Sequence, residues 1–427
     1  SGVFAENAAT VTLERAAVID SHHYGINSQS RARVRMVDAL VRGVVSLELP
    51  GENFPDCPPA GTSLARYHRG TGSGLWAVGG GEIQARRTLV EETQHALTYV
   101  GNSSSLIDLT DSVLRRILPT NPISGKAVYV LSGGSATLNR VLVEDVPIAG
   151  LSAQCPGARI VANDCVVRNI RTRPLPAMQI AGRGLDAHHG GVVLATRTVV
   201  RDAHNFGAYA FNGSTVELTD GLIQGTRASA DAYSAGAGSN FNATVRLRHV
   251  LLEDNVNAGV VTQGLAAGAV LRDVLVDGGF LGERGTAWGV AAAGGANLDA
   301  DQLAVLDAFG GAIVTYRLTG SVSLRARNLY VRGVQPTRQP GAHDAAGVIT
   351  SAGASVDLEN LLVDRGDHGF AVMGYPYGRL SIRRGVFARQ RRLGAILDGE
   401  PGAFDTLSLT DVVAVEVGDP YVRNTLD

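Results

Sequence analysis

The chain has 427 residues, of which 45% are hydrophobic, and carries a net charge of −2. It is far longer than one compact core of about 150 residues, and its hydrophobic content excludes intrinsic disorder. No apolar run approaches the roughly 20 residues that span a bilayer, and the near-neutral charge gives no attraction for nucleic acid, so we expect neither a membrane span nor a nucleic-acid partner.

A repeated pattern of short strands begins at Leu13, in the stretch VTLERAAVID, and continues along the chain. Each repeat has an apolar anchor residue, an apolar residue two positions before it and a third five positions after it. Apolar residues that alternate with polar ones are typical of β-strands. The anchors are Leu13, Met36, Ala85, Leu109, Leu138, Ala162, Ala195, Leu218, Leu247, Leu271, Ala300, Ala326, Leu358, Ile382 and Leu409.

Many repeats then turn through a glycine into a third apolar strand, as in GAYAFNG (207–213) and GVVTQG (259–264). Three short strands bury a face only by stacking on equivalent neighbours. The pattern therefore predicts an all-β parallel β-helix of about fifteen coils, formed by a single domain over 1–427.

The intervals between anchors alternate between short ones of 23 to 26 residues and long ones of 27 to 49 residues. The repeating unit is thus a pair of coils. The extra residues follow the second strand, which predicts long loops along one edge. The longest interval holds a loop insertion at 47–81, the one segment outside the repeat.

The corner residue, two positions after each anchor, alternates in charge over the first eight repeats. Equivalent positions on neighbouring coils lie about 4.8 Å apart, so opposite charges pair there and like charges repel. We predict an ion-pair ladder that fixes the register of the coils, because a slip by one coil would oppose like charges. The ladder residues are Arg15, Asp38, Arg87, Asp111, Arg140, Asp164, Arg197 and Asp220.

Together with this repeat, two phrases carry a resemblance to known proteins: VRNIRTRPLPAMQIAGRGL (167–185) and, less regular, VRGVQPTRQPGAHDAAGV (331–348). The chain resembles the right-handed parallel β-helix proteins of pectin-lyase-like fold. Within that group it is most similar to large secreted repeat proteins of myxobacteria. The resemblance implies a right-handed helix and specifies architecture more than activity.

Many proteins of this fold cleave acidic polysaccharides, with adjacent carboxylates or with calcium and a basic residue. The adjacent acids of this chain, Glu144-Asp145 and Glu253-Asp254, occupy ordinary repeat positions. The acids that follow the second strand lie two coils apart, about 10 Å, too far to share a calcium ion. We therefore predict no catalytic residue, no metal site and no cofactor.

Five histidines fall at one turn of the short coils, where we interpret them as turn residues; they are His22, His23, His95, His204 and His368. The pair His188-His189 is expected in a long loop.

Three cysteines leave the disulfide pattern open. Cys165 occupies a column of valines and is expected to be a buried small hydrophobe. A disulfide between Cys155 and Cys165 is one possibility. Cys57 is either a free thiol or has its partner outside the 427 residues.

The insertion carries the densest group of cationic and aromatic residues: Arg66, Tyr67, His68, Arg69 and Trp76. Such a group recognises sugars or anionic glycans by stacking and charge, so it is our candidate ligand site. The alternative is that it forms an aromatic plug over the adjacent coil.

We expect a secreted or bacterial cell-surface protein, structural and adhesin-like, that binds a glycan or a cell-surface polymer without cleaving it. The first alternative is a polysaccharide lyase or glycoside hydrolase that acts on acidic glycans. The second is a passive stalk that displays another domain. The chain starts at Ser1 and ends in an incomplete coil, so we expect it to be part of a longer array that self-associates through open ends.

Overall fold

The computed structural model describes residues 2–46, 57, 72–119, 124–172, 182–228, 234–279, 281, 287–316, 320–336, 346–350, 353–365, 370–374, 378–390, 395–397 and 406–415. All the named elements in these ranges are β-strands, and they form a parallel β-solenoid. The all-β fold predicted from the repeat is therefore confirmed. Among the described residues, no helix exists that is long and apolar enough to cross a membrane.

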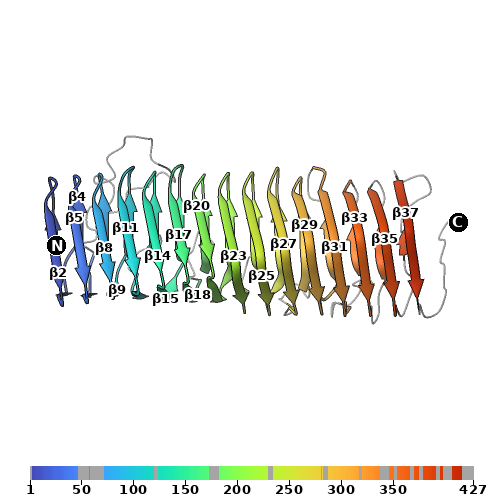
Figure 1. The fold of residues 1–427 in the computed structure, drawn as a ribbon, viewed down its shortest axis with the longest axis horizontal. Coiled ribbons are helices and arrows are strands. Elements are labelled where there is room, and N and C mark those ends of the chain that lie inside the picture. The colour runs from blue at the N-terminus through green and yellow to red at the C-terminus, as the bar shows by residue number, and fades with distance from the viewer. Residues whose placement is uncertain are drawn as a thin grey trace. The chain divides into compact units, whose positions relative to one another are not determined.

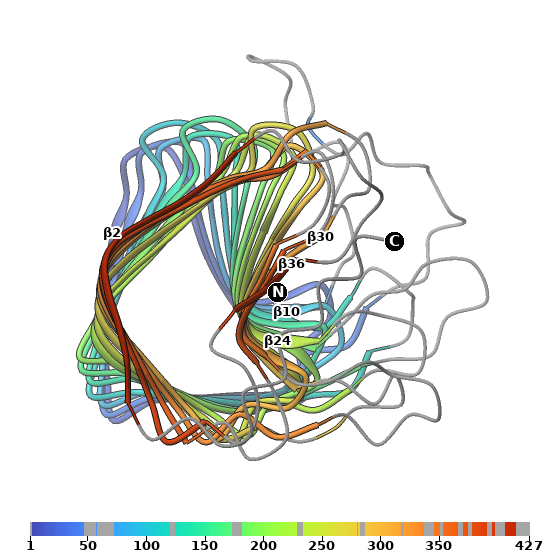
Figure 2. The same ribbon diagram turned by 90° about the vertical axis from the view of Figure 1, so that its right-hand side faces the viewer.

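The chain divides into two compact units, unit 1 (Ser1–Gly221) and unit 2 (Leu222–Asp427). In each unit, every coil contributes its third strand to one sheet, sheet A, and its anchor segment to a second sheet, sheet B. Figure 1 shows the strands of successive coils side by side, and Figure 2 shows β2 and β10, one from each sheet, on different sides of the coil.

Sheet A contains one strand per coil. In unit 1 its strands are β1 (Val3–Ala5), β4 (Tyr24–Gln29), β7 (Ser73–Val78), β10 (Ala96–Gly101), β13 (Lys126–Leu131), β16 (Ala149–Gln154), β19 (Gly182–His188) and β22 (Asn205–Phe211). In unit 2 they are β24 (Ala235–Asn240), β26 (Asn257–Gln263), β28 (Ala287–Ala293), β30 (Gly311–Tyr316), β32 (Ala346–Thr350), β34 (Phe370–Gly374) and β36 (Ala395–Leu397).

Sheet B of unit 1 contains two strands per coil, an anchor strand and a corner strand. The anchor strands are β2 (Thr10–Glu14), β5 (Arg33–Val37), β8 (Glu82–Arg86), β11 (Leu106–Thr110), β14 (Ser135–Asn139), β17 (Arg159–Asn163) and β20 (Val192–Thr196). The corner strands are β3 (Ala17–Ile19), β6 (Leu40–Arg42), β9 (Leu89–Thr93), β12 (Val113–Ile117), β15 (Leu142–Pro147), β18 (Val166–Arg171) and β21 (Val199–Ala203).

In the remaining coils one ten-residue strand replaces this pair. The first of these, β23 (Thr215–Gln224), includes the residue at which the units divide. The others, in unit 2, are β25 (Thr244–Glu253), β27 (Gly268–Asp277), β29 (Asn297–Leu306), β31 (Ser323–Arg332), β33 (Ser355–Asp364), β35 (Arg379–Ala388) and β37 (Thr406–Val415).

The described solenoid has about 12 turns, somewhat fewer than the fifteen coils predicted. Several coils, mainly those after residue 336, are described only in part, so they contribute strands without a complete turn. The long loops expected along one edge fall largely outside the described residues.

Strand register confirms the anchor positions within each unit. In unit 1, Leu13 pairs with Met36, and Leu109 lies between Ala85 and Leu138. The side chains of these positions point into the solenoid, where Met36, Leu109 and Leu138 are almost fully buried. Alternate residues point outward, which explains the polar residues between them.

The predicted insertion ends earlier than residue 81. Ser73–Val78 forms β7, which pairs in parallel with β4 and with β10 in sheet A. Gly74, the second residue of this strand, has no room for a side chain, because a Cβ at that position would lie 2.6 Å from the carbonyl oxygen of Leu97 on the next coil. The segment outside the repeat is therefore confined to residues before β7.

Candidate functional site

Trp76, one of the aromatic residues of the predicted ligand cluster, belongs to the core. Trp76 lies on β7 with 1% of its surface exposed, and its ring stacks on Tyr99 with centroids 3.9 Å apart. Tyr24 packs at 4.7 Å from the same indole ring. Trp76 thus joins neighbouring coils by aromatic packing and offers no free face to a sugar. Arg66, Tyr67, His68 and Arg69 lie outside the described residues, so their role stays a prediction.

The disulfide joins Cys57 to Cys155, whose Cα atoms are 5.5 Å apart. The pairing of Cys155 with Cys165 considered from the sequence is therefore wrong, as is a free Cys57. Cys155 directly follows β16 and packs with Trp76 in one apolar cluster. Cys165 is 2% exposed, which confirms the prediction that it is a buried small residue.

Every corner residue of the repeat adopts a left-handed backbone conformation. The φ angles at these positions lie between 46° and 57° in both units. Such a conformation is costly for most side chains and is tolerated best by asparagine, aspartate and glycine. The corner column thus has a geometric requirement in addition to its charge pattern.

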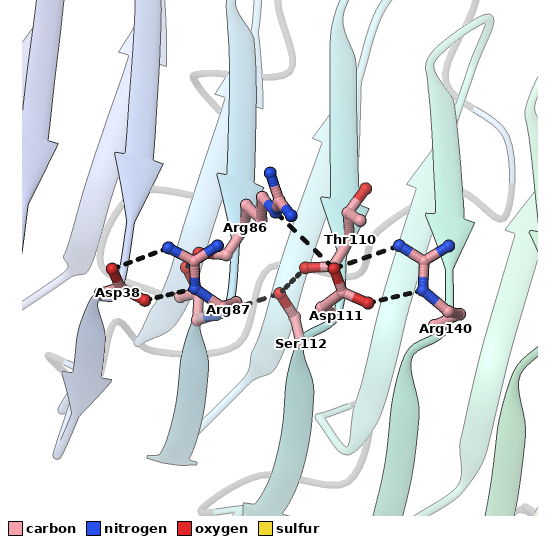
Figure 3. Close-up of polar contacts among 8 residues, drawn as sticks. Asp38, Arg86, Arg87, Thr110, Asp111, Ser112 and Arg140 are labelled. Carbon is pink, nitrogen blue, oxygen red and sulfur yellow. Dashed lines mark hydrogen bonds and ion pairs between the residues drawn. The ribbon is translucent and has the colours of Figure 1, made fainter.

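The charges of the corner column form discrete pairs in unit 1 (Figure 3). Arg87 binds Asp38 through two hydrogen bonds of 2.6 and 2.8 Å, and Arg140 binds Asp111 in the same two-pronged way, at 2.6 and 3.1 Å. Arg197 and Asp164 repeat this geometry. Each of these aspartates takes the arginine of the following coil. The predicted ladder is therefore a series of pairs that join coils two by two.

The pairs affect the acid strength of their carboxyl groups. The hydrogen bonds from Arg87 and Arg140 hold the pKa of Asp38 and of Asp111, respectively, below the usual range, and Arg197 does the same for Asp164. These carboxylates thus stay charged to lower pH than free aspartates.

An open groove of about 840 Å³ lies on the outer face of sheet B in unit 1, beside these pairs. Residues from five successive anchor strands and two corners line it: Glu14, Arg35, Met36, Val37, Gln84, Ala85, Arg86, Arg87, Asp108, Thr110, Thr137, Asn139 and Arg140. Its floor is a row of outward side chains in register, Arg35, Gln84, Asp108 and Thr137. Four adjacent strands place this row over about 14 Å.

The groove is rich in hydrogen-bond donors of fixed direction. Four arginines border it, against the two carboxyl groups of Glu14 and Asp108. Arg87 and Arg140 are held by their corner aspartates, and Arg86 lies 3.7 Å from Asp111. The arginines, amides and hydroxyls can bind carboxylates and hydroxyls of an extended molecule that lies across the strands.

Asp108 is the unusual group on the groove floor. Burial raises the pKa of its carboxyl, and the carboxylate of Glu82 acts in the same direction, while a hydrogen bond from Thr137 opposes them. A carboxyl group with a raised pKa in a groove is a candidate proton donor. Within the described part of the chain, no three His, Cys, Asp or Glu side chains are arranged to hold a metal ion.

Unit 2 has a much smaller hollow of about 70 Å³ on its sheet B, lined by Arg325, Ala326, Arg327, Asp357, Glu359 and Arg383. Here the arginines face carboxylates across the strands, with Arg327 at 3.6 Å from Glu359 and Arg383 at 3.7 Å from the same group. Internal pairing leaves this hollow with little capacity for an acidic ligand.

The acids after the second strand lie at a second corner. Asp20, Glu92, Asp145 and Asp202 all have φ between 50° and 58°, so they occupy left-handed turn positions. The acids one residue earlier are paired with arginines, since Arg115 binds Glu91 at 2.9 Å and Arg168 binds Glu144 at 2.6 Å. These pairs form a second line of charges across the corner strands.

The histidines of the turn differ from one another. His23 has a left-handed φ of 69°, as expected for a turn residue. His95 is buried, and its Nδ1 lies 2.8 Å from the hydroxyl of Ser124. His368 is outside the described residues.

The expectation that His188 and His189 lie in a long loop is wrong, because His188 ends a strand and His189 lies in the turn that follows it. His188 is the last residue of β19, and its Nε2 lies 2.7 Å from Oδ1 of Asp186 on the same strand. The spacing Asp-x-His on a strand puts both side chains on one face, and this signal could have identified them.

Comparison with protein-family models finds no match to this chain, and comparison with curated protein sequences finds none either.

Proposed function

We propose that this chain is an extracellular, adhesin-like β-solenoid that binds an acidic glycan or similar surface polymer along the groove of unit 1 without cleaving it. The observation that carries this proposal is the row of outward side chains in register, bordered by four arginines. Strands repeat about every 4.8 Å, which gives an extended polymer regularly spaced contacts along the groove.

The disulfide between Cys57 and Cys155 supports a location outside the cytoplasm, because disulfides persist in oxidising compartments. The likeness to pectin-lyase-like and myxobacterial repeat proteins agrees with this location and stays a prediction.

The test is a glycan screen read for retention and for new reducing ends or unsaturated products. We expect acidic oligosaccharides to be retained without products, with an affinity that falls as salt increases. The double variant Arg35→Ala with Arg86→Ala should abolish retention. Arg197→Ala is the matched control, because Arg197 is a corner arginine outside the groove. Retention of the oligosaccharide by the double variant would refute the proposal. So would the absence of retention by the wild type, and if no product is released either, the result would favour a passive stalk.

The second candidate function is cleavage of the same polymer, favoured by the raised pKa of Asp108. A protonated Asp108 would donate its proton to the leaving oxygen as the bond between that oxygen and the anomeric carbon breaks, and water would add to the anomeric carbon and release a proton. If products appear, Asp108→Asn should abolish them while leaving retention intact. Products that persist in this variant would exclude Asp108 as the proton donor.

A further inference from the structure

A row of apolar side chains lies on the outer face of sheet B in unit 2. Its members are four positions after the anchors, and each pairs in register with the next across the seven ten-residue strands of this unit. All of them are at least partly exposed, and Leu362, Val386 and Val413 have exposed fractions of 37%, 39% and 54%. We call these residues the outer row: Leu251, Leu275, Ala304, Tyr330, Leu362, Val386 and Val413.

The outer row is continuous, because strand alternation directs every member away from the core. On β33, for example, Leu361 and Val363 on either side of Leu362 are both 1% exposed. A contiguous exposed apolar strip is typical of a surface that contacts another molecule. The charges along its two edges indicate which molecule that is.

The second corner, seven positions after each anchor, forms one edge of the outer row, and its charges are sorted along the chain. Its early coils have acids, Asp254 and Asp307, and its later coils have arginines, Arg365 and Arg389. Asp307 and Arg365 are exposed, and neither makes an ion pair with a residue that the structure describes.

The first corner forms the other edge, and its charges are also ordered. Asp273 lies on an early coil and Arg384 on a later one, and their side chains are 64% and 58% exposed. Read in reverse, this column places a base opposite each acid and a neutral residue opposite each neutral one. Its members in chain order are His249, Asp273, Gln302, Asn328, Asn360, Arg384 and Asp411. Unit 1 differs, because its corner arginines and aspartates pair within the chain.

A second copy of the chain, turned antiparallel about Tyr330, complements both edges at once. Tyr330 is the middle residue of the outer row, so Asp307, one coil before it, lies opposite Arg365 of the other copy. Two coils from the middle, Asp273 lies opposite Arg384 of the other copy. These matches occur together because the strands are evenly spaced.

The apolar side chains fit the same reversal. Ala304 lies opposite Leu362 of the other copy, which sets a small side chain against a larger one. A parallel copy would instead bring the first corner of each coil against the second corner of the same coil, and would oppose Arg384 and Arg389. Like charges that face each other are destabilising, so the antiparallel orientation is favoured.

The size of this surface predicts a weak dimer. Seven strands span about 29 Å, and the five residue steps between the two corners span about 16 Å, so two copies together cover about 900 Å². Specific interfaces begin at about 1,000 Å², so we expect a dissociation constant in the micromolar range.

We propose that unit 2 forms an antiparallel homodimer through the outer row, with Tyr330 on the two-fold axis and Asp307 paired with Arg365 of the other copy. The symmetry repeats this ion pair on both sides of the axis. The dimer uses a different unit from the groove proposed above and does not depend on it.

The first test is sedimentation velocity of the full chain over a concentration series. We expect a species of twice the 44.5 kDa of one chain. Tyr330→Asp should weaken the association at least tenfold, because it opposes two carboxylates on the axis. Val113→Asp is the matched control, since Val113 occupies the same repeat position in unit 1 and the variant should dimerise like the wild type. A chain that stays monomeric at about 100 μM, or a Tyr330→Asp variant that dimerises unchanged, would overturn the proposal.

A charge exchange tests the orientation without removing apolar surface. Asp307→Arg should weaken the dimer roughly tenfold, because it sets arginine against Arg365 twice per dimer. Adding Arg365→Asp to the same chain should restore the wild-type dissociation constant to within about threefold. Failure of the second substitution to restore association would show that these two residues do not face each other.

Cross-linking with a short bis-maleimide locates the axis. Tyr330→Cys should give a covalent dimer, because each Tyr330 lies opposite its own copy. Leu275→Cys should not cross-link with itself, since the two copies of Leu275 lie about 19 Å apart along the row. A mixture of Leu275→Cys and Val386→Cys chains should cross-link. The proposal is overturned if Leu275→Cys cross-links with itself as well as Tyr330→Cys does.

Discussion

Unit 1 and unit 2 build the same coil with different corners. In unit 1 each coil crosses sheet B in two separate strands, and arginine–aspartate pairs join neighbouring corners. In unit 2 a single ten-residue strand passes through the corner, and the column contains neutral residues, such as Asn328 and Asn360, whose amide groups are bonded at 2.7 Å.

The corner backbone is nevertheless the same in both units. Arg87 and Asn328 both have a left-handed φ, of 48° and 52°. The turn therefore requires a residue that tolerates this conformation and does not require an ion pair. The charge pairs of unit 1 add a preference for one register, because Asp38, Asp111 and Asp164 each accept two hydrogen bonds from the corner arginine of the next coil.

The largest expected effect concerns the aromatic stack that unit 1 has on sheet A. Trp76→Ala should lower the free energy of unfolding of unit 1 by about 3–5 kcal/mol, because it removes a fully buried ring. Val314→Ala, at the equivalent repeat position of unit 2, should cost less, because fewer apolar atoms are lost. Denaturant titration with hydrogen exchange on peptides from each unit measures both. Equal decreases in the free energy of unfolding would show that the aromatic stack adds no stability beyond that of an ordinary buried residue.

The next largest effect on stability is expected from the disulfide of unit 1. Unit 2 contains no cysteine. Replacing both Cys57 and Cys155 by serine should destabilise unit 1 by about 2–4 kcal/mol, because the bond closes a loop with a sequence separation of 98 residues. Cys165→Val is the control, since valine suits that column. If reducing agent leaves the hydrogen exchange of unit 1 unchanged, the bond does not stabilise it.

The corner ion pairs predict that the stability of unit 1 depends on pH. The pKa values of Asp38, Asp111 and Asp164 are lowered in the folded state, so the pairs stabilise unit 1 above the ordinary aspartate pKa of about 3.9. That contribution is lost as pH falls through the lower, folded-state values. The triple variant to asparagine should melt at a lower temperature than the wild type at pH 7, and the difference should vanish in acid. Asp411→Asn in unit 2 is the control; a difference that persists in acid would contradict the assignment.

The smallest expected effect is the change in stability when a corner residue of each unit is replaced by glycine. Gln302 has a φ of 55° and lies in unit 2, so Gln302→Gly should relieve backbone strain and raise stability by up to about 1 kcal/mol. Arg197→Gly in unit 1 relieves the same strain but loses the pair with Asp164, so its gain should be smaller. Thermal melts of the two variants decide this, and an equal gain would mean that the pair has no net value.

Much of this architecture could be predicted from the sequence because the repeat fixes both strand positions and register. The groove row could have been found in the same way, since Arg35, Gln84, Asp108 and Thr137 each directly precede an anchor. Knowing the register of the anchors therefore places these side chains in one line on the outer face.

Other features needed three-dimensional information. The partner of Cys155 is in the insertion, and cysteine spacing carries no information about how that segment returns to β16. Trp76 looked like part of a ligand cluster because Arg66 and Tyr67 are near it in sequence, but its strand assignment buries it. The contacts around Asp186 could not be predicted, because β19 begins close to a long loop and its residues were expected to belong to that loop.

The pairing of corners two by two has a consequence for how such a protein changes its length. Within unit 1, deleting or duplicating one coil would bring two arginines or two aspartates together, whereas adding or removing a pair of coils leaves every aspartate beside an arginine. We therefore expect recombination between repeats to be tolerated best in steps of two coils. The number of coils in this region should vary among descendants by even increments.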